Sequence, residues 1–263
     1  MRSLAVWLLL AGAAGAGPVA DLAALPMADV VILGEIHDNP RHHANQAAGV
    51  AALQPSALVF EMLTPAQAAL VVGDRSDPGL GARLGWADAG WPDFAMYQPI
   101  FAAAPVAAVF GAAVPSDALL GVRDPGAVAA LFPDARFGLT EPLAAGDQAA
   151  READQMAAHC DALPADLLPY MVAVQRLRDA TLAARALEAF MALGGPVVVI
   201  TGTGHARKDQ GIPAALARAA PEVRVLSVGQ LEADPGADAP YDLWLVTDPV
   251  PREDPCAAFR AGN

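Results

Sequence analysis

Short apolar runs alternate along the chain with longer stretches in which polar and apolar residues are mixed. The apolar runs predict buried strands at 30–35, 57–61, 106–110, 196–200, 223–228 and 243–247. The stretches between them, such as 42–53 and 91–104, have the spacing of helices. Short strands that alternate with helices form parallel sheets with both faces covered. The pattern therefore predicts an α/β fold with a mostly parallel central sheet and helices on both faces.

A long section between the third and fourth predicted strands has no strong strand signal. Residues 148–159 and 164–193 interleave polar and apolar positions with helical spacing. We expect the section at about 140–193 to form a helical insertion over one edge of the sheet. Glycine, aspartate and serine are frequent at 73–85, which predicts a loop near the strand ends.

The first 17 residues have the pattern of a secretory signal peptide. Arg2 precedes an apolar stretch at 4–11, and small residues follow up to Ala16. We expect cleavage near Ala16, export to the periplasm, and a single domain over 18–263. No cysteine stands near the cleavage region, so no lipid anchor is expected.

Acidic residues outnumber basic ones by 29 to 16, which gives a formal net charge of −13. This balance argues against nucleic acid as a partner, because phosphates require neutralisation by lysine and arginine. Cys160 and Cys256 are the two cysteines, and an even pair in an exported protein suggests a disulfide. A thiolate ligand is the alternative.

Polar side chains follow three of the predicted strands where each strand ends. Glu35 and His37 follow the first strand, Glu61 the second, and His205 the strand at 196–200. The carboxyl ends of parallel strands share one edge, so these side chains are expected to converge. Two carboxylates and two imidazoles suit a metal site or acid–base catalysis. Taken singly, Glu61 also suits a helix N-terminus and His205 a glycine-rich turn.

The residues after the first strand also predict the start of a helix. Gly34 permits a turn, Asp38 or Asn39 offers an N-cap, and Pro40 suits the first helical position. A strand, a polar turn and a helix in this order form the corner at which α/β proteins place their sites.

Two further features add candidate ligand contacts. Arg207 and Lys208 begin a helical stretch and could bind an anion, although exposed basic pairs are usually only solvated. The stretch 86–100 is rich in aromatic residues, which are most often core. Tyr97 within it carries an oxygen that could bind ferric iron, and Tyr170 and Tyr241 are its rivals.

Taken together, these motifs resemble the ChaN-like haem-binding uptake proteins. The resemblance runs from about Val30 to Leu216, and it rests on Gly34–Pro40 with His42, His43 and Gln46, on Glu61, on Trp91 with Tyr97 and Pro99, on His159–Cys160, on Gln175 with Arg178–Asp179, and on 202–213. It implies an α/β fold with a helical subdomain, a haem-related role, and a hydrolase-like cleft shared with Tiki metalloproteases and erythromycin esterases. Two features depart from the family: the lipobox cysteine is absent, and 111–116 is more apolar than expected.

Two hypotheses of different classes follow. The first is an exported haem-binding protein in haem or iron uptake, with Tyr97 as axial ligand and His37, His43 or His205 as alternatives. Arg207 and Lys208 would meet the propionates. A homodimer would cover the flat apolar ligand, and outer-membrane or periplasmic haem transport components would be the partners.

The second hypothesis is a hydrolase, either metal-dependent or of the Glu/His type. Glu35 and Glu61 would act as base or metal ligands, and His37 and His205 as ligands or electrophiles. The resemblance to the family, rather than any single residue, favours the binding protein.

Overall fold

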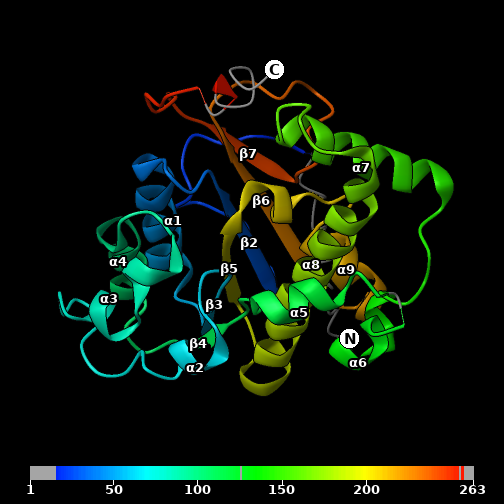
Figure 1. Ribbon diagram of the computed structural model, residues 1–263. Coiled ribbons are helices and arrows are strands. Elements are labelled where there is room, and N and C mark those ends of the chain that lie inside the picture. The colour runs from blue at the N-terminus through cyan, green and yellow to red at the C-terminus, as the bar shows by residue number, and fades with distance from the viewer. Residues whose placement is uncertain (1–15, 125, 255, 258–263) are drawn as a thin grey trace, which may run out of the picture.

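The computed structural model describes residues 16–124, 126–254 and 256–257 (Figure 1). The predicted signal peptide lies outside the described residues except for its last two positions. A seven-stranded parallel sheet forms the centre of the described chain, in the order β1-β7-β6-β2-β5-β3-β4. Its strands are β1 Gly17–Pro18, β2 Val30–Glu35, β3 Ala57–Phe60, β4 Ala108–Gly111, β5 Val197–Gly202, β6 Val225–Leu231 and β7 Leu243–Val246.

The predicted α/β fold with a parallel sheet is confirmed. Each of the six predicted strands is present, and the short strand β1 is added at an edge beside β7. The helices are α1 Pro40–Leu53, α2 Pro65–Ala68, α3 Leu80–Arg83, α4 Phe94–Ala103, α5 Ser116–Gly121, α6 Val128–Leu131, α7 Ala145–Ala158, α8 Leu168–Leu193 and α9 Ile212–Ala219. Short 3-10 turns lie at 86–89, 135–137, 165–167 and 203–206.

Alternate residues of the strands pack against opposite layers of helices. Val31 and Leu33 belong to a core that includes α1 and α4, whereas Val30 and Ile32 belong to a core that includes α8 and α9. Figure 1 shows the sheet between these two layers. Both faces of the sheet are therefore buried, which explains why the strands are continuous apolar runs.

Helices α7 and α8 form most of the section that the sequence analysis expected to be a helical insertion. Helix α8 packs on one face of the sheet, against β5, β3 and the edge strand β4. Small side chains, among them Ala183 and Ala186, are fully buried on its inner side and allow this close approach. The apolar surface of the sheet has to be covered on this side, and α8 with α9 covers it.

The chain leaves neighbouring strands toward opposite faces at the centre of the sheet. β2 leads into α1 on one face, whereas β5 leads through the 3-10 turn at 203–206 into α9 on the other. The two strands pair directly, with Glu35 opposite Gly202. Such a switch point opens a crevice beyond the carboxyl ends of the strands, which is where ligands bind in open α/β sheets.

The predicted disulfide is confirmed. Cys160, just after α7, is bonded to Cys256 with an S–S distance of 2.06 Å. The C-terminal tail thus returns to the carboxyl edge of the sheet, where Arg252 pairs with Asp38 and Glu232. No helix among the described residues is long and apolar enough to cross a membrane.

Candidate functional site

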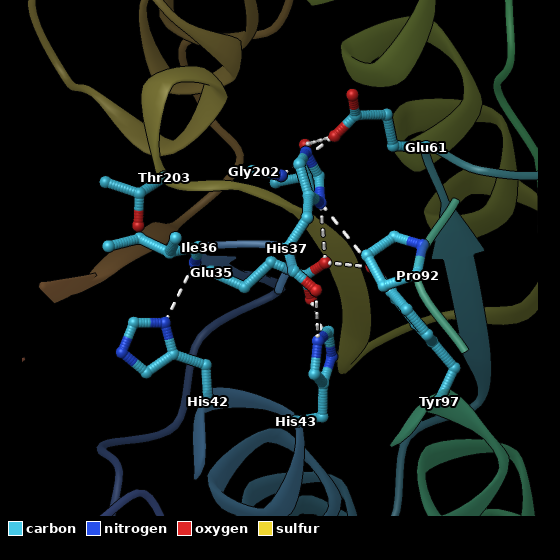
Figure 2. A network of polar contacts seen from close by, with 12 residues as sticks. Glu35, Ile36, His37, His42, His43, Glu61, Pro92, Tyr97, Gly202 and Thr203 are labelled. Atoms are coloured by element: carbon cyan, nitrogen blue, oxygen red, sulfur yellow. Dashed lines mark hydrogen bonds and ion pairs between the residues drawn. The ribbon is translucent and has the colours of Figure 1, made fainter. Parts of the chain in front are cut away.

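Four polar side chains from the strand ends converge at the switch point, as the sequence predicted. The alternation of each strand sends Glu35 to the α1/α4 side of the sheet, with Val31 and Leu33. It sends Glu61 to the α8/α9 side, with Val59. His37 lies in the loop after β2, between these two carboxylates (Figure 2). The site is therefore built from two polar networks, one on each side of the sheet.

The first network surrounds the buried carboxylate of Glu35. Its Oε1 accepts hydrogen bonds from the Tyr97 hydroxyl at 2.7 Å and from His37 Nδ1 at 2.8 Å. Its Oε2 lies 3.3 Å from His43 Nδ1, and His43 Nε2 donates to the carbonyl of His37 at 2.8 Å. Burial opposes ionisation of Glu35, but the hydrogen bonds from His37 and His43 outweigh it and lower its pKa. Glu35 is therefore an anion at neutral pH.

The second network surrounds Glu61 and His205. Glu61 Oε2 accepts bonds from the Thr201 hydroxyl and from the backbone N–H of Gly202, both at 2.8 Å. Its Oε1 lies 3.4 Å from His205 Nε2, and the other ring nitrogen of His205 lies 2.6 Å from Asp179. Although burial disfavours the charged imidazole, the two carboxylates raise the pKa of His205 to about 10. His205 is thus an imidazolium between two acids.

The two networks meet at Gly202. A Cβ built there would lie 3.0 Å from His37 Nε2, which is tight, and 3.7 Å from Glu61 Oε2, which is ordinary contact, so a larger residue would crowd His37. Burial acts to lower the pKa of His37, and the hydrogen bond to Glu35 acts to raise it. The net result is a raised pKa. The space beside His37 Nε2 is therefore kept open by a glycine.

Exposure separates the candidate ligands sharply. The His37 side chain is 33% exposed, whereas those of His43 and His205 are 0% and 7% exposed. Tyr97 is fully buried. Among Tyr97, His37, His43 and His205, His37 is therefore the one that a ligand can reach from outside, and Tyr170 on α8 is also partly exposed.

The local sequence fixes the loop that carries His37. Asn39 is the N-cap of α1, as one of the two expected choices, and its side chain accepts a bond from the backbone of Arg41 at 3.0 Å. Pro40 takes the first helical position. Gly34 lies inside β2 rather than in a turn. A glycine is needed there because a Cβ would come within 2.8 Å of the Thr203 hydroxyl oxygen.

Tyr97 does not have the electrostatic environment of a phenolate ligand. Positive charge near a tyrosine would lower its pKa toward the form that binds ferric iron. Burial and the adjacent carboxylate of Glu35 instead raise the pKa of Tyr97 far above its usual range. The hydroxyl of Tyr97 stays protonated and donates a hydrogen bond to Glu35.

Arg207 and Lys208 both form ion pairs in the structure. Arg207 pairs with Asp154 and Asp209, and Lys208 pairs with Asp242. Asp209 lies two residues from Arg207, whereas Asp154 and Asp242 are distant in sequence. The binding of an anion by these two residues stays a prediction.

Glu35, His37, Glu61 and His205 are bonded to one another and to their neighbours rather than arranged around a common centre. No group of three His, Cys, Asp or Glu side chains among the described residues is placed to hold a metal ion. The described part of the chain therefore gives no support to the metal site that the sequence suggested for these four residues. Glu61 Oε2 and Glu35 Oε1 accept hydrogen bonds from hydroxyl, imidazole or amide donors, whereas the buried Glu35 Oε2 has no hydrogen-bond partner and lies 3.3 Å from His43 Nδ1.

Sequence reasoning gave no role to Asp179 and Gln175 on α8. Both contact His205 Nδ1, at 2.6 and 3.0 Å respectively. A signal was present, because Asp179 occupies the buried stripe of the helix between Val172 and Ala183. A carboxylate in such a stripe needs a polar partner.

An apolar groove lies beside His37. The ring of Trp91 stands edge-on to His37, with ring centres 5.0 Å apart. Trp91 also lines a cavity of 840 Å³ whose walls include Trp86, Pro92 and Phe94. The Trp86 ring nitrogen donates to the carbonyl of Pro92 at 2.7 Å, which fixes this wall. Trp91 therefore connects this aromatic cavity to His37, which does not itself line it.

The fold and the site together define a class: parallel α/β proteins with a buried acid–imidazole cleft at the switch point of the sheet. A family model described as haem-binding uptake, Tiki superfamily, ChaN matches residues 22–216. The chain belongs to this family, and the resemblance seen in its motifs is confirmed.

Comparison with solved structures supports the same fold. A structure of ChaN from Campylobacter jejuni, whose title describes cofacial haem binding, is 17% identical, with 82% of this chain and 86% of that chain covered and a TM-score of 0.57. The type III effector HopBA1 is 14% identical over 84% and 88% of the two chains, with a TM-score of 0.44. At these identities the likeness to ChaN concerns the fold alone, and the likeness to HopBA1 carries no argument. A comparison with curated proteins finds no match.

Proposed function

We propose that this protein binds haem, with the iron held by Nε2 of His37 and the porphyrin seated in the groove beside Trp91. The observation that carries the proposal is the partly exposed imidazole of His37, whose Nδ1 is hydrogen-bonded to the buried carboxylate of Glu35. Membership of a haem-binding uptake family supports it.

The donor set around His37 fits an iron ligand. Its Nδ1–H is committed to Glu35, which fixes the tautomer and leaves Nε2 as the free nitrogen. Histidines that bind metals usually donate their second N–H to a carboxylate or a carbonyl, which orients the ring and raises its basicity. Tyr97 reinforces this arrangement from behind, because its hydroxyl donates to the same oxygen of Glu35.

The groove fits a flat apolar ligand. Its volume of 840 Å³ lies within the usual range of cofactor pockets, about 300–1,000 Å³. Trp91 and Pro92 offer flat apolar surfaces next to His37, and such surfaces favour stacking with an aromatic macrocycle.

The test is a spectroscopic titration of the purified protein with haemin. Wild type should bind haemin and develop the bands of an imidazole complex, and His37→Ala should lose those bands. Glu35→Gln should weaken binding by roughly 10- to 100-fold, because it removes the carboxylate behind the ligand.

His159→Ala is the matched control, since His159 is a partly buried histidine at the end of α7, outside the groove. If wild type does not bind haemin, the proposed function fails. If Tyr97→Phe loses the bands while His37→Ala keeps them, haem binding stands and the ligand is Tyr97.

A second candidate function rests on the other network. We infer that Asp179, His205 and Glu61 could support acid–base catalysis on a hydrolysable substrate, as in the hydrolase hypothesis. The support is a buried imidazolium between two carboxylates, with a cavity of 420 Å³ next to Asp179 and Gln175. Hydrolysis of an activated ester such as p-nitrophenyl acetate, lost in Glu61→Gln and retained in Glu188→Gln, would favour this function, because Glu188 is exposed on α8 and does not line this cavity. Wild-type rates equal to those of Glu61→Gln would reject it.

We also propose that the protein is exported to the periplasm and takes part in haem or iron uptake with haem transport components, as a homodimer. The support is the N-terminal sequence pattern and the uptake family. Mass spectrometry of periplasmic material should find a chain beginning between about Gly15 and Ala20. An intact Met1 in the cytoplasm would contradict export, and a monomer at all haemin ratios would contradict the dimer.

A further inference from the structure

Three arginines from different helices line one small cavity behind Asp179. Arg151 comes from α7, Arg176 from α8 and Arg218 from α9. The cavity has a volume of 170 Å³ and is closed on one side by the loop after the 3-10 turn at 135–137. It is far smaller than the groove beside Trp91, so it suits a small group rather than a macrocycle.

These guanidinium groups have few acidic partners. Arg176 donates only to the carbonyls of Gly138 and Glu141, at 2.8 and 3.0 Å. Arg151 has one long contact, 3.5 Å to the carbonyl of Gln210, and no carboxylate partner among the described residues. Arg218 is the one that forms an ion pair, with Glu141.

The charge balance of this cavity is opposite to that of the protein. Three positive side chains face Glu141 and Asp179, and Asp179 is committed to His205. The chain as a whole carries 29 acidic and 16 basic residues. The arginines also repel one another: burial, followed by the charges of Arg151 and Arg218, lowers the pKa of Arg176. Clustering of this kind is unfavourable unless an anion joins it.

The loop at Gly138 forms one wall of the cavity, and its backbone packs closely against Arg218. Gly138 adopts a positive φ of 66°, and a Cβ there would lie 2.4 Å from Arg218 Nε. A glycine thus lets the loop carbonyl reach Arg176 while the backbone passes directly over Arg218. The arrangement keeps two arginines in fixed positions, which lowers the entropic cost of binding.

We propose that this cavity, lined by Arg151, Arg176 and Arg218, is a binding site for a small oxyanion, either a phosphate group or a carboxylate group of a soluble ligand. Planar guanidinium forks match the oxygens of both groups. The site is independent of the haem proposal, because it lies on the α8/α9 side of the sheet and shares no residue with the groove beside Trp91.

Calorimetric titration with sodium phosphate and with sodium succinate, each against sodium chloride at equal ionic strength, tests the proposal. Wild type should bind at least one of the two anions in preference to chloride. Phosphate alone would identify a phosphate ligand, succinate alone a carboxylate ligand, and both a general oxyanion site.

Arg151→Gln is the decisive variant, since the single hydrogen bond that Arg151 forms with the described residues is long and its loss should not unfold the protein. It should weaken anion binding by roughly tenfold or more, as expected for a charge-assisted contact. Arg185→Gln is the control, because it removes the same charge from α8 but lines a different cavity.

Two results would overturn the proposal. One is wild type that binds neither anion better than chloride. The other is equal weakening by Arg151→Gln and Arg185→Gln, which would indicate net charge rather than a site. Haemin binding by Arg151→Gln should equal that of wild type, so failure here leaves the proposed haem function unaffected.

Discussion

Replacing Tyr97 by phenylalanine removes one oxygen atom from the centre of the site and leaves the ring in place. That oxygen donates a hydrogen bond of 2.7 Å to Glu35, in surroundings where both side chains are buried. The ring packs against His43 and Trp86, and these contacts survive the substitution. The change therefore isolates the bond between the phenol and the carboxylate.

The expected loss of stability follows from the charge of the acceptor. Hydrogen bonds to ionised groups contribute about 1.5–3 kcal/mol, and the carboxylate of Glu35 stays buried when its partner is lost. We expect Tyr97→Phe to lower the free energy of unfolding by about 2 kcal/mol. With an m value of about 2 kcal/mol per molar urea, the midpoint of unfolding should fall by roughly 1 M.

Urea denaturation followed by circular dichroism measures this change, and Tyr241→Phe is the matched control. Tyr241 is also buried, but its hydroxyl reaches only a backbone carbonyl at 3.5 Å. Tyr241→Phe should lower the free energy of unfolding by less than about 0.5 kcal/mol, since its hydroxyl lies at the limit of hydrogen-bond distance. Equal losses in the two variants, or no loss in Tyr97→Phe, would refute a stabilising bond between Tyr97 and Glu35.

Two further predictions concern stability. The 96-residue separation of Cys160 and Cys256 puts the contribution of the disulfide at roughly 4 to 5 kcal/mol at most, so the double serine variant should unfold at lower urea, and an unchanged midpoint would contradict this. Because the folded-state pKa of His205 is raised from 6.5 to about 10, its contribution to stability is complete below about pH 6.5 and is lost as the pH rises through about 10. The difference in stability between wild type and His205→Gln, measured by urea unfolding across this range, should shrink with rising pH, and a constant difference would count against the ion pairs with Glu61 and Asp179.

The positions of the strands were predictable because both faces of the sheet are buried. Val30–Glu35 and Val197–Gly202 are continuous apolar runs for that reason, and runs of this kind are recognisable without knowledge of the fold. The two-residue strand β1 is too short to have any period. The convergence of Glu35, Glu61 and His205 was predictable as well, since parallel strands present their carboxyl ends at one edge.

The partners of these residues were not predictable in the same way. Asp179 reaches His205 from a helix 26 residues earlier, and Tyr97 reaches Glu35 from 62 residues later. Which residues of α4 and α8 face the site depends on how the helices rotate on the sheet. Arg207 pairs with Asp154 on α7, and Lys208 pairs with Asp242 in the segment before β7. No local sequence pattern reveals either pair.

Rescue of a cavity variant by free imidazole tests most directly whether His37 binds the iron. His37→Gly removes the imidazole, and the carboxylate of Glu35 behind it remains to orient a replacement. We predict that the haemin complex of this variant lacks the bands of an imidazole complex and regains them on addition of imidazole, whereas wild type does not change. A variant whose spectrum equals that of wild type before imidazole is added would contradict the assignment of His37 as the iron ligand.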